Sequence, residues 1–260
     1  MDTLEKDLLA GTLRKTMSAA SGRVLDLAMI ELGWAEMLAE LPEVAIPTVF
    51  RLLGETGSHG PLLNDVLLAA AGRSTGRTVP MPYAGGRWVV WERTDAAGDG
   101  LDTELPLHVV PAGEPMPLAA GRRALGWWLV GTGRAMLALA RAHVLARQQF
   151  GKPLASFQAV RHRLAETLVA LDGAEATLQA ATDPFGALLA KAAAGQAALT
   201  AARHCQQVLG GIGFTAEHDL HRHVRRALVL DGLLGSAREL TREAGALLVE
   251  ERSAPRLVDL

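Results

Sequence analysis

Two short stretches in the C-terminal half of the chain bring together residues that can hold a phosphate or a flat ring. The first is Arg147-Gln148-Gln149-Phe150-Gly151-Lys152-Pro153-Leu154, with Gln158 following. The second is Gln207-Val208-Leu209-Gly210-Gly211-Ile212-Gly213-Phe214-Thr215, with Glu217 two residues on. A guanidinium fork matches phosphate oxygens, and glycines allow the backbone to approach a phosphate or ring closely. Taken alone, each stretch also fits a simple helix end, with a basic residue or a glycine near the last carbonyls.

Titratable side chains gather just after the second stretch. His218 and His221 are three residues apart, so they could share a helix face and hold a metal ion. The HExxH spacing is absent, and three nearby arginines would repel a cation, namely Arg222, Arg225 and Arg226. We therefore interpret the segment as a solvated helix face and predict no metal site.

Length and composition favour a helical protein with a substantial core. Of the 260 residues, 49% are hydrophobic and only 4% aromatic, and Ala, Leu and Arg are abundant. The formal net charge of −2 is spread evenly along the chain, so we predict no nucleic-acid surface. The first residues lack an apolar stretch and arginines interrupt the most hydrophobic helix, so neither a signal peptide nor a membrane span is expected. The lone Cys205, predicted to pack inside, fits a reducing cytoplasm.

Residues 1–75 are predicted to form a helical region and residues 76–116 a small β region. The expected helices are Leu8–Met17, Arg23–Leu41, about Val44–Gly57 and about Pro61–Ala71. Prolines and glycines then punctuate the chain, and two runs have strand character, Arg87–Trp91 and Leu107–Val110. We expect about four strands that lean on the helices, with Trp88 and Trp91 on one packed face.

Residues 117–252 are predicted to form an antiparallel four-helix bundle. The expected helices are about Leu118–Arg147, Ser156–Ala181, Pro184–Leu209 and Glu217–Glu250, the last broken near Asp231-Gly232. Ser156 is a suitable N-cap, and Pro184 after Asp183 suits a first helical turn. Residues 253–260 are expected to be a frayed tail.

The two stretches, in this order and at this distance, resemble the signatures of the acyl-CoA dehydrogenase family. The first is similar to the family's R-x-x-F-G segment with its later Gln, and the second to Q-x-x-G-G-x-G-[FY]-x-x-E. Leu32-Gly33-Trp34 and Leu52-Leu53-Gly54-Glu55 resemble the family's N-terminal helical domain. The chain is thus identified as a shortened, actinobacterial-type member with a mainly α fold: N-terminal helices, a reduced β insert and a C-terminal four-helix bundle.

The resemblance implies contacts with FAD, whose ADP half is held in this family partly by a neighbouring subunit. Arg147 would approach the pyrophosphate, and Phe150 would pack on the flavin or adenine face. Gln149 and Gln158 would offer amide hydrogen bonds. The adenine–ribose end would be lined by Gln207, Gly210 and Gly211.

The resemblance also implies where a catalytic base should stand, and no acid stands there. Desaturation of an acyl thioester needs a carboxylate for the α-proton. The family's commonest position, just before the pair Gly235-Ser236, holds Leu234, and the alternative at the start of the first bundle helix holds Gly121. Asp231 is a weak candidate, better interpreted as a solvated or capping residue. Arg122 matches a family arginine near the active site, or is a surface charge.

Three hypotheses follow for the function. In the first, the chain is a non-catalytic subunit of a heterodimeric or heterotetrameric acyl-CoA dehydrogenase, acting on a steroid side chain or another bulky acyl-CoA. It would share FAD with a second dehydrogenase chain that supplies the base. In the second, it is a self-sufficient flavoenzyme with a different base. In the third, it is a non-enzymatic scaffold that uses the bundle to form oligomers.

Overall fold

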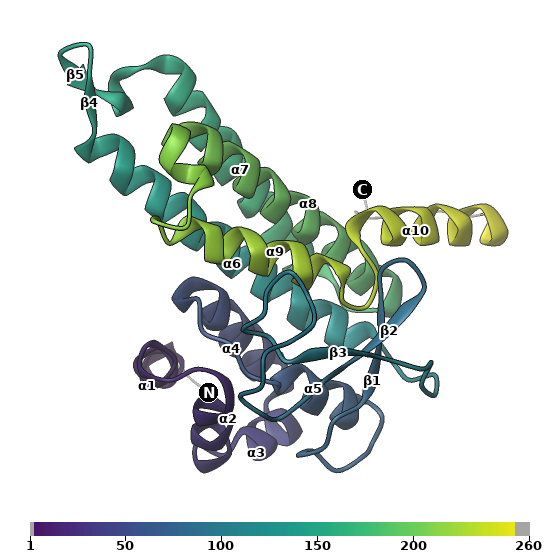
Figure 1. Cartoon of the computed structure of the whole chain (residues 1–260). Helices are drawn as coiled ribbons and strands as arrows, with labels where there is room; N and C mark the ends of the chain where they lie inside the picture. The colour runs from purple at the N-terminus through teal and green to yellow at the C-terminus, as the bar shows by residue number, and fades with distance from the viewer. Residues whose placement is uncertain (1–2, 253–260) are drawn as a thin grey trace.

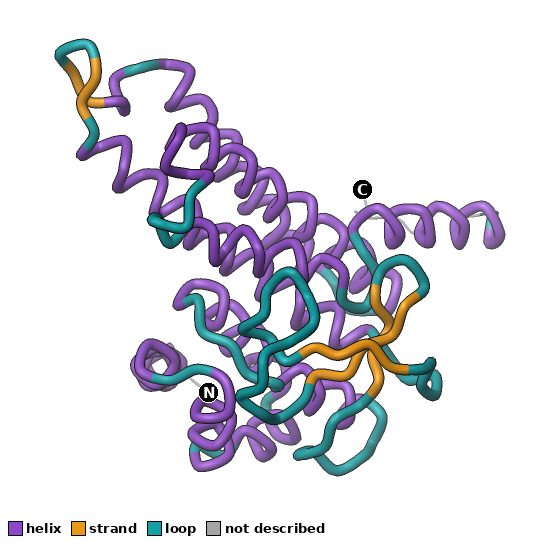
Figure 2. The backbone as a smooth tube through the Cα atoms, viewed as in Figure 1, coloured by secondary structure: helices purple, strands orange, loops and turns teal. Residues whose placement is uncertain are grey.

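The computed structural model describes residues 3–252, and it shows a mainly α protein with one small sheet, which confirms the predicted fold class. Five N-terminal helices and the sheet form the lower part of the molecule in Figure 1, and a long helical bundle crosses above them. A hairpin extends from the upper-left end of this bundle, and the last helix projects to the right. Figure 2 shows that the larger sheet occupies one side only, beside the bundle.

The N-terminal region contains one helix more than the sequence predicts. Its helices are α1 (Thr3–Ala19), α2 (Gly22–Glu31), α3 (Trp34–Glu40), α4 (Pro42–Thr56) and α5 (Leu62–Ala70). The single helix expected over residues 23–41 is wrong. Gly33 has φ 78°, a left-handed conformation that ends one helix and starts the next at an angle.

The β region contains three strands among the described residues, where about four were expected. Strands β1 (Pro80–Tyr83), β2 (Arg87–Trp91) and β3 (Leu107–Val110) form an antiparallel sheet in sequence order, in which Met81 pairs with Val89 and Val89 with Val109. The expectation that Trp88 and Trp91 share a face is wrong, since residues three apart in a strand point to opposite sides. Trp91 is fully buried, whereas Trp88 is half-buried.

The C-terminal region is a bundle in which the predicted helices are present. Its elements are α6 (Ala119–Ala146), β4 (Gln148–Gln149), β5 (Lys152–Pro153), η1 (Leu154–Ser156), α7 (Gln158–Ala180), α8 (Pro184–Leu209), η2 (Gly210–Phe214), α9 (Leu220–Gly232) and α10 (Ala237–Glu251). The break expected near Asp231-Gly232 separates α9 from α10. Asp183 caps α8 by accepting a hydrogen bond from the Gly186 N–H at 2.6 Å. Ser156 is not an N-cap, because it belongs to η1 and Phe157 precedes α7.

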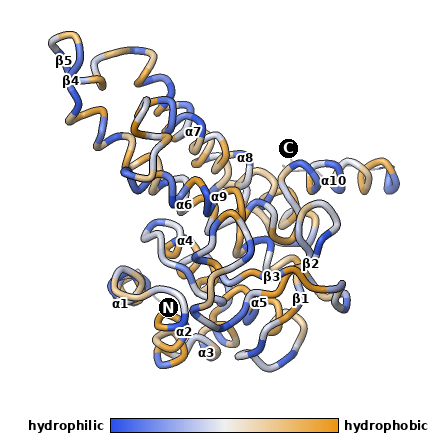
Figure 3. Tube along the Cα trace, in the orientation of Figure 1, coloured by the Kyte–Doolittle hydropathy of each residue, from blue (hydrophilic) through white to orange (hydrophobic). Residues whose placement is uncertain are grey.

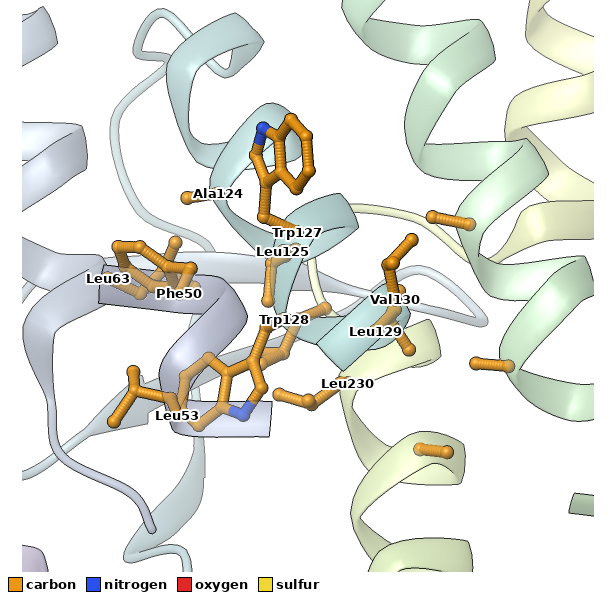
Figure 4. Packing of buried hydrophobic residues seen from close by; sticks show 14 of the residues in the cluster. Phe50, Leu53, Leu63, Ala124, Leu125, Trp127, Trp128, Leu129, Val130 and Leu230 are labelled. Carbon is orange, nitrogen blue, oxygen red and sulfur yellow. The ribbon is translucent and has the colours of Figure 1, made fainter. Parts of the chain in front are cut away.

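The core is built around the first half of α6. The Trp128 ring stacks on Trp91 with centroids 5.6 Å apart and meets the edge of Phe50 at 5.7 Å. Figure 4 shows Trp128 beside Phe50 and Leu53, whereas Trp127 points to another side of the helix. This contact joins the N-terminal helices, the sheet and the bundle in one continuous hydrophobic cluster. Helix α10 packs separately on α8, through Leu188, Ala192, Leu240 and Ala244.

Helices α4 and α6 cross with their backbones in contact. A Cβ atom added to Gly54 would lie 2.6 Å from the carbonyl carbon of Gly131 and closer still to backbone atoms of Trp128 and Thr132. Backbone atoms cannot move aside as a flexible side chain can. The absence of a side chain at residue 54 therefore sets the distance between the two helices and seats the aromatic cluster.

Gly54→Ala should destabilise the protein strongly. We expect a loss of about 3 kcal/mol of unfolding free energy, near the upper part of the usual overpacking range, because the new methyl group would overlap three backbone atoms of α6. Gly11→Ala is the matched control, since a Cβ at this helical position meets nothing within 4 Å and should be neutral or slightly stabilising. Urea denaturation of both variants measures the difference, and equal stabilities would contradict the close crossing.

Candidate functional site

The first motif forms a hairpin and not merely a helix cap. Arg147 ends α6, and its N–H donates to the His143 carbonyl at 2.8 Å. The chain then turns back at Phe150 and Gly151, with φ values of 52° and 75°, so that β4 pairs with β5. Two left-handed residues in succession make the hairpin turn that matches the twist of its strands. Phe150 therefore occupies a conformation that side chains rarely adopt.

The side chains of this hairpin face away from the rest of the chain. Phe150 is 90% exposed, and its ring meets the edge of Phe157 at 6.1 Å. The Lys152 ammonium lies 4.5 Å from the centre of the Phe157 ring. Arg147, Gln149 and Gln158 are exposed as well. The predicted FAD-contacting groups of the first motif are thus accessible only to something outside this chain.

The second motif lies at the same end of the bundle. Helix α8 ends at Leu209, and η2 follows with Gly210 at φ 66°. Gln207 and Gly211 are exposed, and Gly210 is partly exposed. The His143 ring, one turn before Arg147, meets the edge of the His218 ring at 6.4 Å, just beyond the second motif. Figure 1 shows both segments at the end of the bundle remote from α10.

The two positions that the family resemblance assigns to a base face each other. Leu234 is 1% exposed. A Cβ atom added to Gly121 would lie 2.8 Å from Leu234 Cδ1 and 2.7 Å from Leu67 Cδ2. In the sequence, residues 121 and 234 are two separate positions that both lack an acidic side chain. The structure joins them in one dry apolar contact, where a carboxylate would have neither space nor solvent.

The backbone around Leu234 is bonded directly to the sheet. The Leu234 N–H donates to the Pro82 carbonyl and the Ala84 N–H to the Gly232 carbonyl, both at 2.8 Å. Leu234 has φ 56°, a left-handed conformation that costs a branched side chain about 1–2 kcal/mol. Because β1 and the α9–α10 turn share hydrogen bonds, a flat ring cannot enter between them there.

Arg122 supports the same turn. Its Nε donates to the Leu234 carbonyl at 3.3 Å, and its two terminal nitrogens hold the Glu243 carboxylate at 3.2 and 3.1 Å. Its side chain is only 13% exposed. The guanidinium proposed as a weak substrate contact is therefore occupied by groups of this chain.

A buried lysine that sequence reasoning missed lies beneath the turn. Lys191 is fully buried, and its Nζ donates to the carbonyl of Asp231 at 2.6 Å and to that of Gly235. Burial lowers the pKa of Lys191 to about 7. The sequence does contain a feature that could have revealed this lysine: it is the only charged residue between Asp183 and Arg203, in an alanine-rich helix.

Asp231 caps α10 and is enclosed. Its Oδ1 accepts a hydrogen bond from the Ala237 N–H at 3.1 Å, and burial raises its pKa. The same oxygen packs so closely on Gly195 that a Cβ there would overlap it. The capping interpretation is confirmed, but the expectation of a solvated side chain is wrong. An enclosed carboxylate already bonded to a backbone N–H is poorly placed to take a proton from a substrate.

A small polar cavity lies where α4, α6 and α9 meet. It measures about 150 Å³ and its ionisable lining is Asp219, Arg222, His223 and Arg226. Arg226 is neutralised by Asp102 and by Glu104, the latter at 3.0 Å. Ligand pockets for cofactors are usually larger, about 300–1,000 Å³, and mostly apolar. This cavity is suited to water and not to a flavin or an acyl chain.

The remaining candidates make no catalytic group. Cys205 is buried, as predicted, and burial raises its pKa to about 12. The expected shared helix face of His218 and His221 is wrong, since α9 starts at Leu220. Within residues 3–252, no group of three or more His, Cys, Asp and Glu side chains could hold a metal ion. Over the same residues, none of the helices combines the length and the apolar character that crossing a bilayer requires.

The protein should become more stable as pH rises above neutrality. Folded Lys191 has a pKa of about 7 and the unfolded residue 10.5, so the unfolded chain binds more protons between these values. We expect a gain of about 1 kcal/mol from about pH 7 to about pH 8, which stays below the ordinary thiol pKa of about 8.5. Lys191→Met should remove this slope, and the exposed control Lys15→Met should keep it. An unchanged slope in Lys191→Met, measured by denaturation across pH, would contradict the buried ammonium.

Comparison with known proteins identifies the helical bundle. Residues 116–244 match the acyl-CoA dehydrogenase C-terminal domain. The acyl-CoA dehydrogenase FadE34 of Mycobacterium tuberculosis is 41% identical over 127 residues, which cover 45% of this chain and 18% of that protein. The chain thus aligns with less than a fifth of the length of this curated relative.

Two solved structures share the fold over almost the whole chain. The ChsE4–ChsE5 complex of Mycobacterium tuberculosis has a TM-score of 0.74 and 19% identity, covering 98% of this chain and 99% of that chain. The steroid ACAD Tcur3481–Tcur3483, as a G363A variant, has a TM-score of 0.69 and 19% identity, covering 96% and 99%. These similarities show the fold alone. The match of the bundle shows that the chain carries the C-terminal domain of the acyl-CoA dehydrogenase family, whose members generally use FAD.

Proposed function

We propose that this chain is a non-catalytic subunit of an FAD-dependent acyl-CoA dehydrogenase that introduces an α,β double bond into an acyl-CoA. A second dehydrogenase chain supplies the catalytic base and the pocket for the acyl group. This chain supplies contacts to the ADP half of the partner's FAD. The observation that carries the proposal is the contrast between the exposed motifs at one end of the bundle and the sealed contact of Gly121 with Leu234 at the other.

The exposed hairpin fits a role in trans. Arg147 can offer its fork to a pyrophosphate, and Phe150 presents a free ring face for an adenine. Gln149 and Gln158 add amide donors and acceptors. A left-handed, 90% exposed phenylalanine contributes little to the fold of this chain. Its position is explained by a partner that covers it.

The sealed contact argues against a base of its own. The reaction removes a proton from the α carbon and a hydride from the β carbon, and FAD serves as the hydride acceptor. Leu234 has no group that can accept the proton, and Gly121 has no side chain. Asp231, the base of the self-sufficient alternative, is enclosed by Gly195 and bonded to Ala237.

The substrate class follows from the fold relatives and belongs to this proposal. Two structures of similar fold are a complex of two chains and a steroid ACAD. We therefore favour a bulky acyl-CoA, such as a steroid side chain, held by the partner. Because this chain contributes only one side of the cofactor site, the other chain determines the shape of the acyl pocket.

The number of flavins tests the composite site. This chain purified alone should be colourless, and its complex with a co-purified second dehydrogenase chain should contain one FAD per pair of chains. The absorbance of the flavin near about 450 nm, set against the protein concentration, measures the ratio. Two FAD per pair, or a yellow chain that oxidises acyl-CoAs alone, would contradict the proposal.

Arg147→Ala should weaken FAD binding by that complex without affecting the fold of this chain. Loss of a charge-assisted hydrogen bond to phosphate is worth about 1.5–3 kcal/mol, so we expect a roughly tenfold to hundredfold larger dissociation constant for FAD. Arg147→Lys should recover part of the affinity, because it keeps the charge but not the fork. Arg238→Ala, at an exposed position on α10, is the control. Equal FAD affinity in Arg147→Ala and in the control would contradict the assigned role.

A further inference from the structure

The end of the bundle that carries the first motif is strongly basic. Residues 141–165 hold five of the chain's 26 Lys and Arg residues, two histidines and none of its 28 Asp and Glu residues. The five are Arg141, Arg147, Lys152, Arg161 and Arg163. The even distribution of charge expected from the whole sequence is therefore wrong here. We call residues 141–165 the basic arm.

The cations of the basic arm cluster in space as well as in sequence. Arg134 on α6 contacts Asp172 and Glu175 on α7 at 2.7 and 2.6 Å, which sets the alignment of these antiparallel helices. When residues are counted from this contact along both helices toward the hairpin, Arg147 and Arg161 lie at about the same height along the bundle. The hairpin with Lys152 lies just beyond (Figure 1). Hydrophilic colour recurs along this hairpin and the adjoining helix ends in Figure 3.

The fold leaves these charges uncompensated. Arg141, Arg147 and Arg161 are exposed, and within residues 3–252 none of them forms an ion pair. Arg163, in contrast, contacts Glu166 at 3.6 Å and the His204 Nε2 atom at 3.2 Å. By contrast, Arg93 is held by Asp26 at 2.5 Å and also by Asp65. Unneutralised like charges repel each other, so a negative surface outside the chain would stabilise the basic arm.

We propose that the basic arm is a docking surface for an acidic rim on the partner dehydrogenase chain, which it reaches by electrostatic attraction before the hairpin enters the FAD site. The inference rests on the proposed function and adds the surface that brings the two chains together. Arg141 is six residues before Arg147 on α6, about 9 Å along the helix axis. One pyrophosphate therefore cannot account for both cations, and a wider acidic surface can.

A protein rim fits the basic arm better than a nucleic acid does. The tip presents Phe150 with the amides Gln148 and Gln149, a small mixed surface that suits a protein cleft. Charges at the edge of an interface act over about 10 Å at moderate salt. They mainly raise the association rate and its dependence on salt, and they change dissociation little.

Charge reversal outside the FAD motif tests the docking surface. The double variant Arg141→Glu/Arg161→Glu is compared with Arg77→Glu/Arg238→Glu, which makes the same change of charge at exposed positions elsewhere. Association of each with the FAD-loaded dehydrogenase chain that co-purifies with wild-type protein is followed by stopped-flow fluorescence from about 20 to 300 mM NaCl, a range over which screening grows several-fold. A DNA duplex and free FAD serve as separate probes.

We expect the arm variant to associate about tenfold more slowly than the wild type at low salt and the control less than about twofold more slowly. The rates should converge at high salt, with unchanged dissociation and one FAD per pair. Equal slowing in both variants, wild-type association that ignores salt, or tighter binding of the arm to DNA than to the partner would overturn the docking surface. One FAD per pair together with equal slowing removes only this inference, whereas no association at any salt removes the composite enzyme as well.

Discussion

The left-handed turn at Leu234 is the constraint on which the rest of the account depends. Four contacts hold it: the Pro82 carbonyl on β1, the Arg122 guanidinium, the buried Lys191 ammonium beneath, and the side-chain contact with Gly121. They come from three elements, the sheet, α6 and α8, so one short segment holds these elements together just before α10 begins. A turn held by this many contacts can retain a strained backbone conformation. It also closes the position at which the family resemblance expects a base.

The arginines inside the body of the protein and those of the basic arm differ in whether they form ion pairs. Inside the body, buried arginines are matched by carboxylates, as Arg226 is by Asp102 and Arg93 by Asp65, because an unpaired buried charge is costly. At the basic arm, exposed arginines have no carboxylate partner, since water solvates an exposed charge. The least exposed arginines are thus paired within the chain, whereas Arg141, Arg147 and Arg161 of the basic arm are not. In the proposed complex, an acidic rim on the partner would supply the negative charge that the basic arm lacks.

Elements that depend on local signals could be predicted from the sequence. The Asp183-Pro184 start of α8 and the break after Gly232 follow from capping and helix-breaking preferences. The break at Gly33 was missed because an apolar helical pattern continues on both sides of it. Lys191 and Asp231 were missed or misplaced for another reason: their burial arises from packing between α8 and α9, which no local pattern reports. The two motifs were found from the resemblance, but their exposure at one end of the bundle required the structure.

The central claim is that this chain touches the adenine half of a flavin whose chemistry occurs on another chain. Photolabelling the two-chain complex with 8-azido-FAD, which carries its reactive group on the adenine, tests that contact directly. After irradiation, the labelled peptides are identified by mass spectrometry. The account predicts label in this chain within residues 147–158 or 207–211. Label confined to the partner chain, at full occupancy of the flavin, would contradict it.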